Sequence, residues 1–454
     1  MATTLKVNTP DLKKFHYIKG LPLLGNLPEF NSDRLGTLQR VAQAGDVYGL
    51  RFGPFPVILF NKPEHVHALM VDHAYDFDKG PAIHDTFRPT IGDGIFSSEG
   101  EFHRHQRKLI SPPFQPRHIA SYAETMGYYS EQIQQSWSDG SIIDVNQNMT
   151  NLTMSIIGKA LFDADVFTET DELGAAMTAI FSYITHRLSV LAAPPYSWPT
   201  PRNRRTHRAA ALLRNHISRF ITERRNHPID RNDFLSILLQ AKDEDGNPMS
   251  DEQVMAECLT LFGAGHETTA TALTWTWYLL CQHPEIYERV QQEVDSTLQG
   301  RTPSYADLAH LPYCLQVFKE AMRLYPPAYL FSRVALRDVE IDGYLIPKGL
   351  SVMFSPYTLH RRTDYFPDPD RFDPERFTAE REKQLPRYAY LPFGAGPRIC
   401  IGMYFAMMEG HLLLATLAQR VRFSLLPNQA IEPDPFHHLT LRPTGALNVS
   451  VRKR

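Results

Sequence analysis

The sequence predicts a mainly α-helical fold with a minor β region, built as one large domain over residues 1–454. Three observations support this prediction. Most of the chain carries apolar residues at helical spacing. Two stretches, about 40–65 and 335–360, instead contain short apolar runs broken by Gly and Pro, as β-hairpins do. No Gly/Ser-rich linker, repeat or low-complexity segment divides the chain, although its length by itself allows about three domains.

Composition and charge exclude several classes of function. Hydrophobic residues make up 43% and charged residues 21%, and the net charge is −3, which gives no support for nucleic-acid binding. The four cysteines lack disulfide or zinc spacing, which indicates a reducing compartment. Residues 1–20 are polar and contain neither a signal-peptide core nor an apolar run of about 18 residues. We expect a cytoplasmic monomer without a membrane anchor.

The predicted β region consists of two hairpins. The first pairs Asp46–Arg51 with Pro56–Phe60 across a turn that contains Gly53 and Pro54. The second runs from Val339 to Phe354 and turns at an Asp-Gly pair, a dipeptide typical of tight hairpin turns. Both are short, so they form the smaller part of the fold.

A long helix is predicted between Ser250 and His283. Ser250 and Gln253 form a capping-box pattern, and the helical spacing continues to the Pro284 boundary. A helix of roughly 33 residues spans about 50 Å, enough to cross a domain. Its interior, Phe262–Thr269, contains two glycines and two threonines, which are unfavourable there. Close helix–helix contact through small residues, or a widened turn beside a ligand, explains this equally well.

Cys400 lies between a glycine-rich loop and an apolar helical stretch over 401–421. A helix N-terminus favours the thiolate form, and Arg398 adds a nearby cation. A lone cysteine is most often a small buried hydrophobic residue, and a zinc site needs ligand spacing that this chain lacks. No partner base for a nucleophile is evident, so an axial thiolate to haem iron remains. Close approach of a flat ligand is allowed by the glycines of the loop, Gly394, Gly396 and Gly402.

The loop resembles the haem-binding loop of the cytochrome P-450 family, the haem-thiolate monooxygenases. The match covers every fixed position of that motif, namely Phe393, Gly396, Arg398, Cys400 and Gly402. The resemblance implies a single P-450-like domain with haem b between the long central helix and the helix after the cysteine. Cys400 would be the axial ligand, with Phe393, Gly394 and Gly402 beside the haem.

The middle of the long helix is similar to the oxygen-activating segment of the same family. The matching residues are Ala264, Gly265, Glu267, Thr268 and Thr269. O2 reduction consumes protons, so the resemblance assigns Glu267 as a proton source and Thr268 as a hydroxyl that donates and accepts hydrogen bonds.

Glu320 and Arg323 lie three residues apart on a helix that ends before Pro326, so they share a face. By itself such a pair predicts a surface ion pair that contributes little. The segment around Arg376 resembles the part of the family that completes a Glu-Arg-Arg cluster. The resemblance therefore implies a buried structural network of Glu320, Arg323 and Arg376 that braces the haem loop.

Haem carries two propionates, and four residues are candidates for holding them. His103 and Arg107 are four apart and share a helix face, while Arg333 and Arg398 match arginines of the family. A solvated basic face remains the alternative for His103 and Arg333. Outward-facing cations on the same segment would form a patch for an acidic electron donor, and these are Arg104, His105, Lys108 and Arg117.

The resemblance indicates an apolar substrate pocket but not its ligand. The matching residues are Phe87, Phe96, Phe262, Ala264, Ala328 and Leu330, although each aromatic ring is equally compatible with ordinary core packing. Pro194–Pro201 resembles the loop between two helices that cover the pocket, and a basic edge follows it. That edge suggests a carboxylated substrate such as a fatty acid, and it consists of Arg202, Arg204, Arg205 and Arg208.

The predicted activity is insertion of one atom of O2 into a hydrophobic substrate by hydroxylation or epoxidation. The chain contains no flavin or iron–sulfur motif. Electrons ultimately from NAD(P)H are therefore expected to arrive through a separate ferredoxin or flavodoxin with its reductase. Two alternatives stay open: a partner-independent haem-thiolate peroxygenase or isomerase, and a non-enzymatic haem gas sensor.

Overall fold

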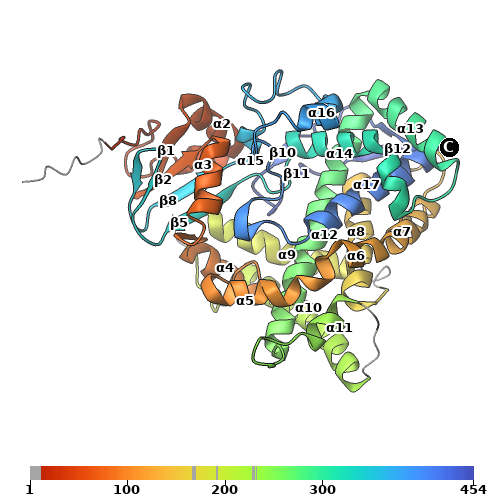
Figure 1. Cartoon of the computed structure of the whole chain (residues 1–454), viewed down its shortest axis with the longest axis horizontal. Coiled ribbons are helices and arrows are strands. Elements are labelled where there is room, and N and C mark those ends of the chain that lie inside the picture. Colours follow the sequence, from red (N-terminus) through yellow and green to blue (C-terminus); the bar gives the residue numbers. More distant parts are fainter. Residues whose placement is uncertain (1–11, 166–169, 191–192, 228–230, 232) are drawn as a thin grey trace, which may run out of the picture.

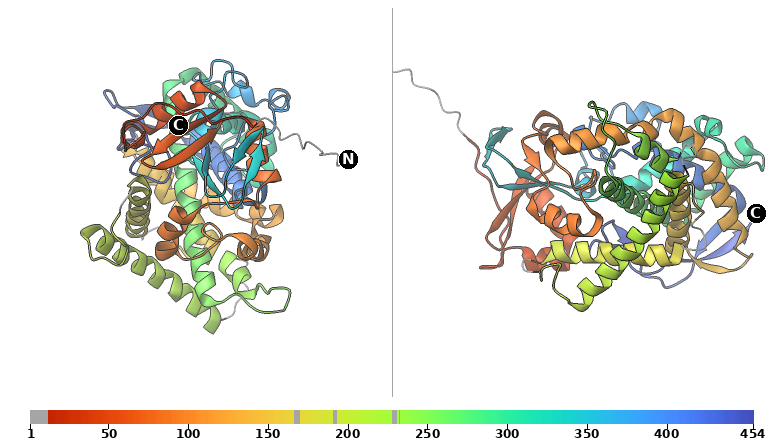
Figure 2. Two further views of the ribbon diagram at one scale, coloured as in Figure 1. Left: turned by 90° about the vertical axis from the view of Figure 1, so that its left-hand side faces the viewer. Right: turned by 90° about the horizontal axis from the view of Figure 1, so that it is seen from below.

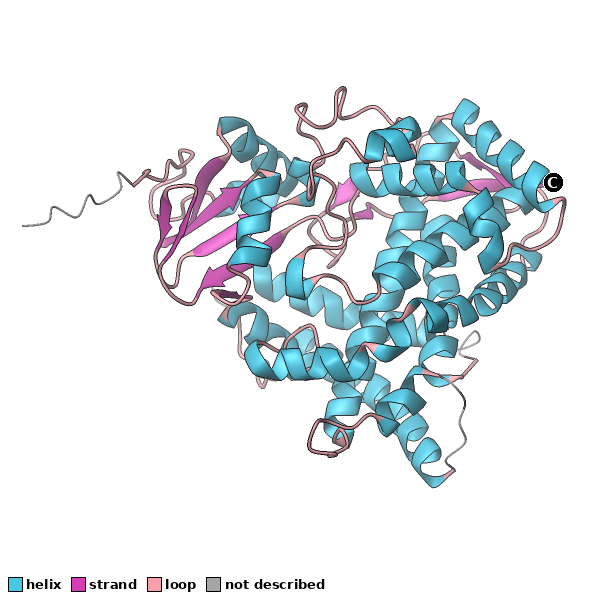
Figure 3. Cartoon of the chain, in the orientation of Figure 1, coloured by secondary structure: helices cyan, strands magenta, loops and turns pink. Residues whose placement is uncertain are grey.

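The computed structural model describes residues 12–165, 170–190, 193–227, 231 and 233–454, and these form a mainly α-helical fold with a minor β region, as predicted. The largest sheet lies at one end of the molecule and helices fill most of the remainder (Figures 1 and 3). Residues 1–11 of the polar N-terminal stretch lie outside the described residues.

The largest sheet has five strands in the order β1-β2-β8-β5-β3. The first predicted hairpin is present, with Val47 opposite Phe60 and Phe52 opposite Phe55. Strand β8 then pairs in parallel with β2 and antiparallel with β5. The sheet therefore joins segments almost 300 residues apart in the chain. Its strands are β1 (Val47–Phe52), β2 (Phe55–Phe60), β3 (Phe77–Asp78), β5 (Phe331–Ala335) and β8 (Ser351–Phe354).

The second predicted hairpin is shorter than expected. Only β6 (Val339–Ile341) and β7 (Tyr344–Ile346) pair with each other, across Asp342 and Gly343, which have φ of 50° and 77°. The rest of the region leaves the hairpin and joins the large sheet as β8. Spacing along the sequence could not show this because strand pairing depends on distant partners. Further pairs near the C-terminal end of the chain are β4 (Ile142–Asp144) with β12 (Asn448–Lys453), β12 with β9 (Val421–Leu425), and β10 (Pro433–Asp434) with β11 (Arg442–Pro443).

The predicted long helix is α12 (Asp251–Gln282), which runs through the centre of the molecule (Figure 1). The Ser250 hydroxyl caps it by accepting a hydrogen bond from the Gln253 amide at 3.3 Å. Its 32 residues correspond to about 48 Å. It packs along α8 (Val145–Phe162), and most of its side chains are buried. This burial, rather than propensity, stabilises a helix that carries glycines in its interior.

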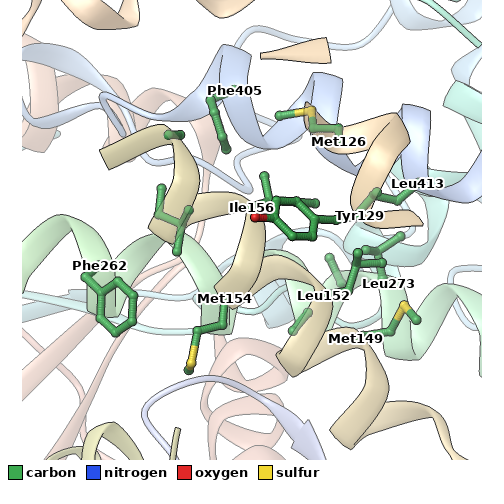
Figure 4. Close-up of a cluster of buried hydrophobic side chains, with 14 of the residues drawn as sticks. Met126, Tyr129, Met149, Leu152, Met154, Ile156, Phe262, Leu273, Phe405 and Leu413 are labelled. Carbon is green, nitrogen blue, oxygen red and sulfur yellow. The ribbon is translucent and has the colours of Figure 1, made fainter. Parts of the chain in front are cut away.

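The helix after Cys400 is α17 (Met403–Arg420), which begins two residues later than expected. It contacts α7 (Ala123–Gln135), α12 and α14 (Pro312–Leu324). Figure 4 shows the resulting core, in which Ile156 of α8 lies among side chains of α7, α12 and α17. The cysteine loop is thus anchored on a helix whose position is fixed by the main core.

Two further pairs of helices cover the central helix. Helix α10 (Pro201–Asn226) packs against both α12 and α9 (Thr170–Ser189), and the view from below has α9 and α10 toward the viewer in yellow and yellow-green (Figure 2). Helices α4 (Pro81–Ile91) and α5 (Gly100–Ile110) lie nearer the sheet. The other helices are α1 (Leu27–Ser32), α2 (Arg34–Ala44), α3 (Pro63–His67), η1 (Ala68–Asp72), η2 (Pro112–Phe114), α6 (Pro116–Ser121), α11 (Phe234–Gln240), α13 (Pro284–Leu298), η3 (Tyr305–His310), α15 (Pro356–Leu359), η4 (Pro374–Phe377), α16 (Ala379–Glu382) and η5 (Gly396–Arg398).

None of the helices in the described residues combines the length and apolar character needed to cross a membrane.

Candidate functional site

The loop that carries Cys400 closes on itself just before α17. The Cys400 amide donates to the Phe393 carbonyl at 2.9 Å, and the turn between them is η5. Gly396 has φ of 64°, and a Cβ there would lie 1.7 Å from the Met70 carbonyl oxygen. Only glycine fits this position, because both the backbone conformation and the contact with η1 exclude a side chain.

The other two glycines of the loop are less crowded. Gly394 also has a positive φ, 70°, and its nearest neighbour would be the Phe331 ring at 3.8 Å. A Cβ on Gly402 would meet only Cys400 Sγ and Phe114, each at an ordinary 3.9 Å. Protein packing therefore explains Gly396 but leaves room for a flat group beside Gly394 and Gly402.

The electrostatics at Cys400 differ from the sequence-based expectation. The Gly402 amide and the Arg107 charge both lower the pKa of the thiol, as a helix end predicts. Desolvation is the larger effect, however, and it raises the pKa above its ordinary value. The Cys400 side chain is nevertheless exposed, so it lines an open space among atoms that exclude most water. The protein alone does not favour the thiolate, and a metal cation at the sulfur would supply the missing positive charge.

Several cations gather beside this loop. Arg107 donates to the Ile399 carbonyl at 2.8 Å, and Arg398 donates to the Ser98 carbonyl at 2.8 Å. Arg398 also pairs with Glu99, which lies 3.4 Å from the Lys79 ammonium. His103 is buried, and desolvation with the charges of Lys79 and Arg107 lowers its pKa to about 4. His103 is therefore neutral at pH 7, so the predicted solvated basic face does not describe it.

Arg333 is the least compensated of these cations. Its side chain is buried, and its one hydrogen bond within the described residues goes to the adjacent Ser332 carbonyl at 2.7 Å. Desolvation lowers its pKa to about 10, and Asp78 opposes this only in part. It also lowers the pKa of Lys79 through its charge. A buried guanidinium without a carboxylate partner is costly, which indicates an anionic ligand at this position.

One face of α12 opens toward the interior. Ala264 is exposed in the middle of this buried helix, and Thr268, one turn later, is half-buried. The Thr268 hydroxyl donates to the Ala264 carbonyl at 3.0 Å. Their neighbours Gly263 and Gly265 face other helices, since a Cβ on Gly263 would meet Phe181 and one on Gly265 would meet Ile157. Both explanations of the two glycines therefore apply. Gly263 and Gly265 allow close contact with neighbouring helices, and the face that carries Ala264 borders open space.

Glu267 points away from that open face toward β11. Its Oε1 accepts from the Thr440 hydroxyl at 2.9 Å and lies 3.2 Å from Arg442 Nε. Thr440 also bonds Thr271 at 3.1 Å. The carboxyl is buried, and desolvation raises its pKa although Arg442 and Thr440 act in the opposite direction. The chain thus holds an acid with a raised pKa one residue from Thr268.

Glu320 and Arg323 form a buried ion pair on α14, not a surface one. Arg323 donates from Nε and Nη2 to the two Glu320 oxygens at 2.6 and 2.8 Å, and both side chains are fully buried. Arg376 Nε lies 3.4 Å from Glu320, so the three predicted residues are together. Arg323 also donates to the His360 carbonyl, and His360 accepts from the Leu391 amide at 2.8 Å. The network therefore reaches the start of the cysteine loop.

The residues predicted to line the pocket are not all brought together. Phe87 on α4 is buried and its ring centroid lies 4.7 Å from that of Phe96, which is 40% exposed. Phe262 instead packs in the main core, with its ring against Phe162 and His266. We assign Phe262 to helix packing, the alternative that its apolar surroundings favour. Ala328 and Leu330 are half-buried in the segment before β5.

The sequence analysis missed the partners of the predicted residues. Lys79 and Glu99 complete the cation cluster, and Thr440 and Arg442 hold Glu267. Glu409 on α17 is buried, and burial raises its pKa to about 8 although the side chain of Thr269 acts in the opposite direction. A charged residue within an apolar helix was the available signal for Glu409. The other partners come from distant segments, so no local spacing identifies them.

Comparison with known proteins decides the family. The family model described as Cytochrome P450 matches residues 16–449. The chain belongs to the cytochrome P450 family. It is 38% identical to cyclooctatin synthase of Streptomyces melanosporofaciens over 93% of each chain, and 31% identical to pentalenene oxygenase of Streptomyces avermitilis over 91% of this chain and 92% of the relative. The solved structure of a retinoic acid bound cyanobacterial relative, CYP120A1, superposes with a TM-score of 0.86 at 28% identity and covers 98% of this chain and 100% of its own.

This cytochrome P450 is a haem-dependent monooxygenase, an oxidoreductase that uses O2 and electrons derived from NAD(P)H through redox partners and acts on a hydrophobic substrate. The residues of the site fit haem. Among the described residues Arg333 forms no ion pair with a carboxylate, Arg107 bonds a backbone carbonyl, and Lys79 and Arg398 share Glu99, so haem would bring two propionates to a site short of negative charge. The exposed thiol of Cys400 supplies a suitable soft ligand.

Proposed function

We propose that Cys400 ligates the haem iron and that the cation cluster holds the propionates. Bound haem supplies the iron at which O2 is reduced and one oxygen atom passes to the substrate. Arg107 and Arg398 are held beside the cysteine loop by hydrogen bonds to the Ile399 and Ser98 carbonyls, and each guanidinium has further N–H groups that would serve a propionate. Arg333 and neutral His103 complete the set.

The cysteine assignment is tested by the visible spectrum of the reduced protein under CO. The wild-type protein should give the strongly red-shifted Soret band of a thiolate-ligated ferrous haem. Cys400→Ser should lose that band while it still binds haem through the propionate cations. The same shift in both proteins would refute the assignment.

The proton supply is assigned to Thr268, on the open side of α12, and to Glu267, on the side that faces β11. The Thr268 hydroxyl donates to the carbonyl of exposed Ala264 and can accept from water; releasing the Ala264 bond would free its one hydrogen to point toward the substrate side. Burial raises the pKa of Glu267, which favours a protonated carboxyl, and Thr440 and Arg442 keep that carboxyl oriented. This pair supports reductant-dependent oxygenation over the peroxygenase, isomerase and gas-sensor alternatives. NAD(P)H consumption that requires both substrate and redox proteins would support it, whereas equal product from peroxide alone would not.

For the substrate, the proposal is an apolar cyclic terpene or terpene alcohol. The observation that carries it is that apolar Ala264 borders the open face of α12, and that the neighbouring α4 and the segment after it carry the apolar Phe87–Phe96 ring pair, while Arg107 and Arg398 are hydrogen-bonded beside the cysteine loop. The basic edge at the start of α10 is exposed to solvent. Among the relatives, cyclooctat-9-en-7-ol 5-monooxygenase of Streptomyces melanosporofaciens is 36% identical over 90% of each chain.

A fatty acid remains the second candidate because of one cavity. A space of about 300 Å³ between α9 and α10 is lined by His186, Arg187 and Arg202, which would suit a carboxylate. Spin-state titration separates the two candidates. A cyclic terpene alcohol should shift the haem spin state at lower concentration than a fatty acid of equal carbon number. Tighter binding of the acid, abolished by Arg202→Gln, would favour the second candidate.

Electron delivery is assigned to a ferredoxin or flavodoxin that docks near α5. Arg104, His105, Lys108 and Arg117 are all exposed, as an acidic partner requires. Arg104 and Lys108 pair with Glu101 and Glu244, but exposed pairs exchange readily with other anions. Arg117→Glu should slow reduction by the partner and weaken its dependence on salt, while reduction by dithionite stays unchanged. Equal slowing with both reductants would contradict this docking site.

We further propose that residues 1–454 act as one monomeric unit in the cytoplasm. The observation that supports a reducing compartment such as the cytoplasm is that all four cysteines are free thiols, two of them buried. Sedimentation that depends on protein concentration would contradict the monomer.

A further inference from the structure

The segment Gly92–Ser98, which joins α4 to α5, is pressed against α12 unusually closely. Gly92 has φ of 87°, and a Cβ there would lie 2.7 Å from the Ala256 Cβ. A Cβ on Gly94 would lie 2.5 Å from the Thr260 hydroxyl and 2.8 Å from the Ala256 carbonyl oxygen. Both contacts are too short for any side chain, so this approach to α12 depends on glycine.

One buried carboxyl fastens this segment. Glu257 Oε2 accepts a hydrogen bond from the Ile95 amide at 2.9 Å, and the Glu257 side chain is fully buried. Its other oxygen and the Thr260 hydroxyl have no partner among the described residues. Burial raises the pKa of Glu257 to about 7, although the Ile95 amide opposes this. Burying a carboxyl that makes a single hydrogen bond to the backbone costs free energy, and an apolar residue at this position would stabilise the core more.

Glu257 lies on the same face of α12 as the open site. Glu257 and Ala264 are seven residues apart, or two turns, and Thr268 follows one turn later. At 1.5 Å per residue the first two are separated by about 10 Å along the helix. The fastened segment therefore covers the end of the face on which Ala264 and Thr268 lie.

The other end of the segment is attached to the cysteine loop. The Ser98 carbonyl accepts from Arg398 at 2.8 Å, and the Ser97 carbonyl accepts from His84 at 2.9 Å. Between the two attachments, Phe96 presents an exposed ring with the Lys79 ammonium 5.1 Å from its centroid. The segment thus spans from α12 to the cysteine loop and carries one exposed aromatic ring.

We propose that Glu257 is a positioning residue for the substrate. By holding Gly92–Ser98 against α12 it fixes Phe96 at the edge of the face that contains Ala264, and so it determines how tightly substrate binds and which of its atoms is oxidised. This inference rests on the proposed substrate side of α12. It assigns Glu257 no part in oxygen activation, since within the described part of the chain its carboxyl bonds the Ile95 amide alone.

The test compares Glu257→Leu, which removes the acceptor, with Glu257→Gln, which keeps one. The probe is a cyclic terpene alcohol that shifts the spin state of the wild-type haem. Glu257→Leu should weaken its binding by about tenfold or more, as expected for losing a buried hydrogen bond to a carboxyl, and should change the ratio of products. Glu257→Gln should restore both. Glu252→Leu, an exposed position on the first turn of α12, is the matched control and should change neither.

Failure of this inference can be told apart from failure of the proposed function. Unchanged affinity and product ratio in Glu257→Leu, with the red-shifted CO band intact, would overturn the role of Glu257 only. Absence of that band in the wild type would overturn the haem-thiolate assignment instead. If Glu257→Leu does not fold, Gly94→Ala provides the second variant, because its Cβ would displace the segment while Glu257 remains. An unaltered product ratio in Gly94→Ala would also refute the proposal.

Discussion

Replacing Glu320 by glutamine removes one charge from the centre of the network under the cysteine loop. Arg323 donates hydrogen bonds to both Glu320 carboxylate oxygens at 2.6 and 2.8 Å, and the Asp373 amide donates to one of them at 2.9 Å. Glutamine keeps a single oxygen, and its amide group would face a donor on Arg323 or on Asp373. The guanidinium would remain fully buried without a counter-charge.

The size of the effect follows from this burial. Removing one partner of a buried ion pair costs about 3–5 kcal/mol, because the other charge is left without compensation. We expect Glu320→Gln to lower the free energy of unfolding by about this amount, and to lower haem content because His360 links Arg323 to the Leu391 amide of the loop. Urea unfolding followed by the fluorescence of buried Trp275 and Trp277 measures the first quantity, and the ratio of Soret to protein absorbance measures the second.

The chain offers a closely matched control. Glu101 and Arg104 have the same i,i+3 spacing on a helix, but their side chains are 86% and 58% exposed. Glu101→Gln should therefore change stability little. If Glu320→Gln and Glu101→Gln shift the urea midpoint equally, with full haem content in both, burial is not what makes the Glu320 pair important and the reasoning is refuted.

Three further predictions follow from single contacts. Gly396→Ala should abolish haem binding because its Cβ would lie 1.7 Å from a carbonyl oxygen. Gly349→Ala, with φ of 84° and no atom within 4 Å, should keep its haem and lower the free energy of unfolding in urea by only about 1–2 kcal/mol through backbone strain. Equal losses of haem and of stability in the two variants would contradict the steric argument. If Glu267 is the proton source, the kcat of the wild type should fall as rising pH ionises this raised-pKa acid, and Glu267→Gln should have a lower kcat without that fall; an unchanged pH profile in the variant would exclude it as the proton source. Glu409→Gln should become more stable relative to wild type as pH rises from about 5 to about 8. In that range Glu409 keeps its proton in the folded wild type but loses it on unfolding, so rising pH favours unfolding of the wild type and leaves the variant unaffected. A constant difference in the free energy of unfolding across that range would show that Glu409 is not protonated in the folded protein.

The sequence determined the helical class and the chemistry of the main positions. Helical spacing and the Ser250 cap located α12 to within a residue at each end, because such signals are local. The cysteine loop could also be recognised, since its glycines and Cys400 are neighbours in the chain. The spacing of Glu320 and Arg323 placed them on one face, but it could not show whether that face was buried.

Only the tertiary structure decided which partners these residues meet. Glu267 depends on Thr440 and Arg442, Glu257 on the amide of Ile95, and β8 on β2, all of them more than 100 residues away. Desolvation also arises only in the folded chain, and at Cys400 it outweighs the lowering of the pKa that the helix end produces. Local spacing sets which side chains share a face, whereas burial and long-range contacts set their charge and their role.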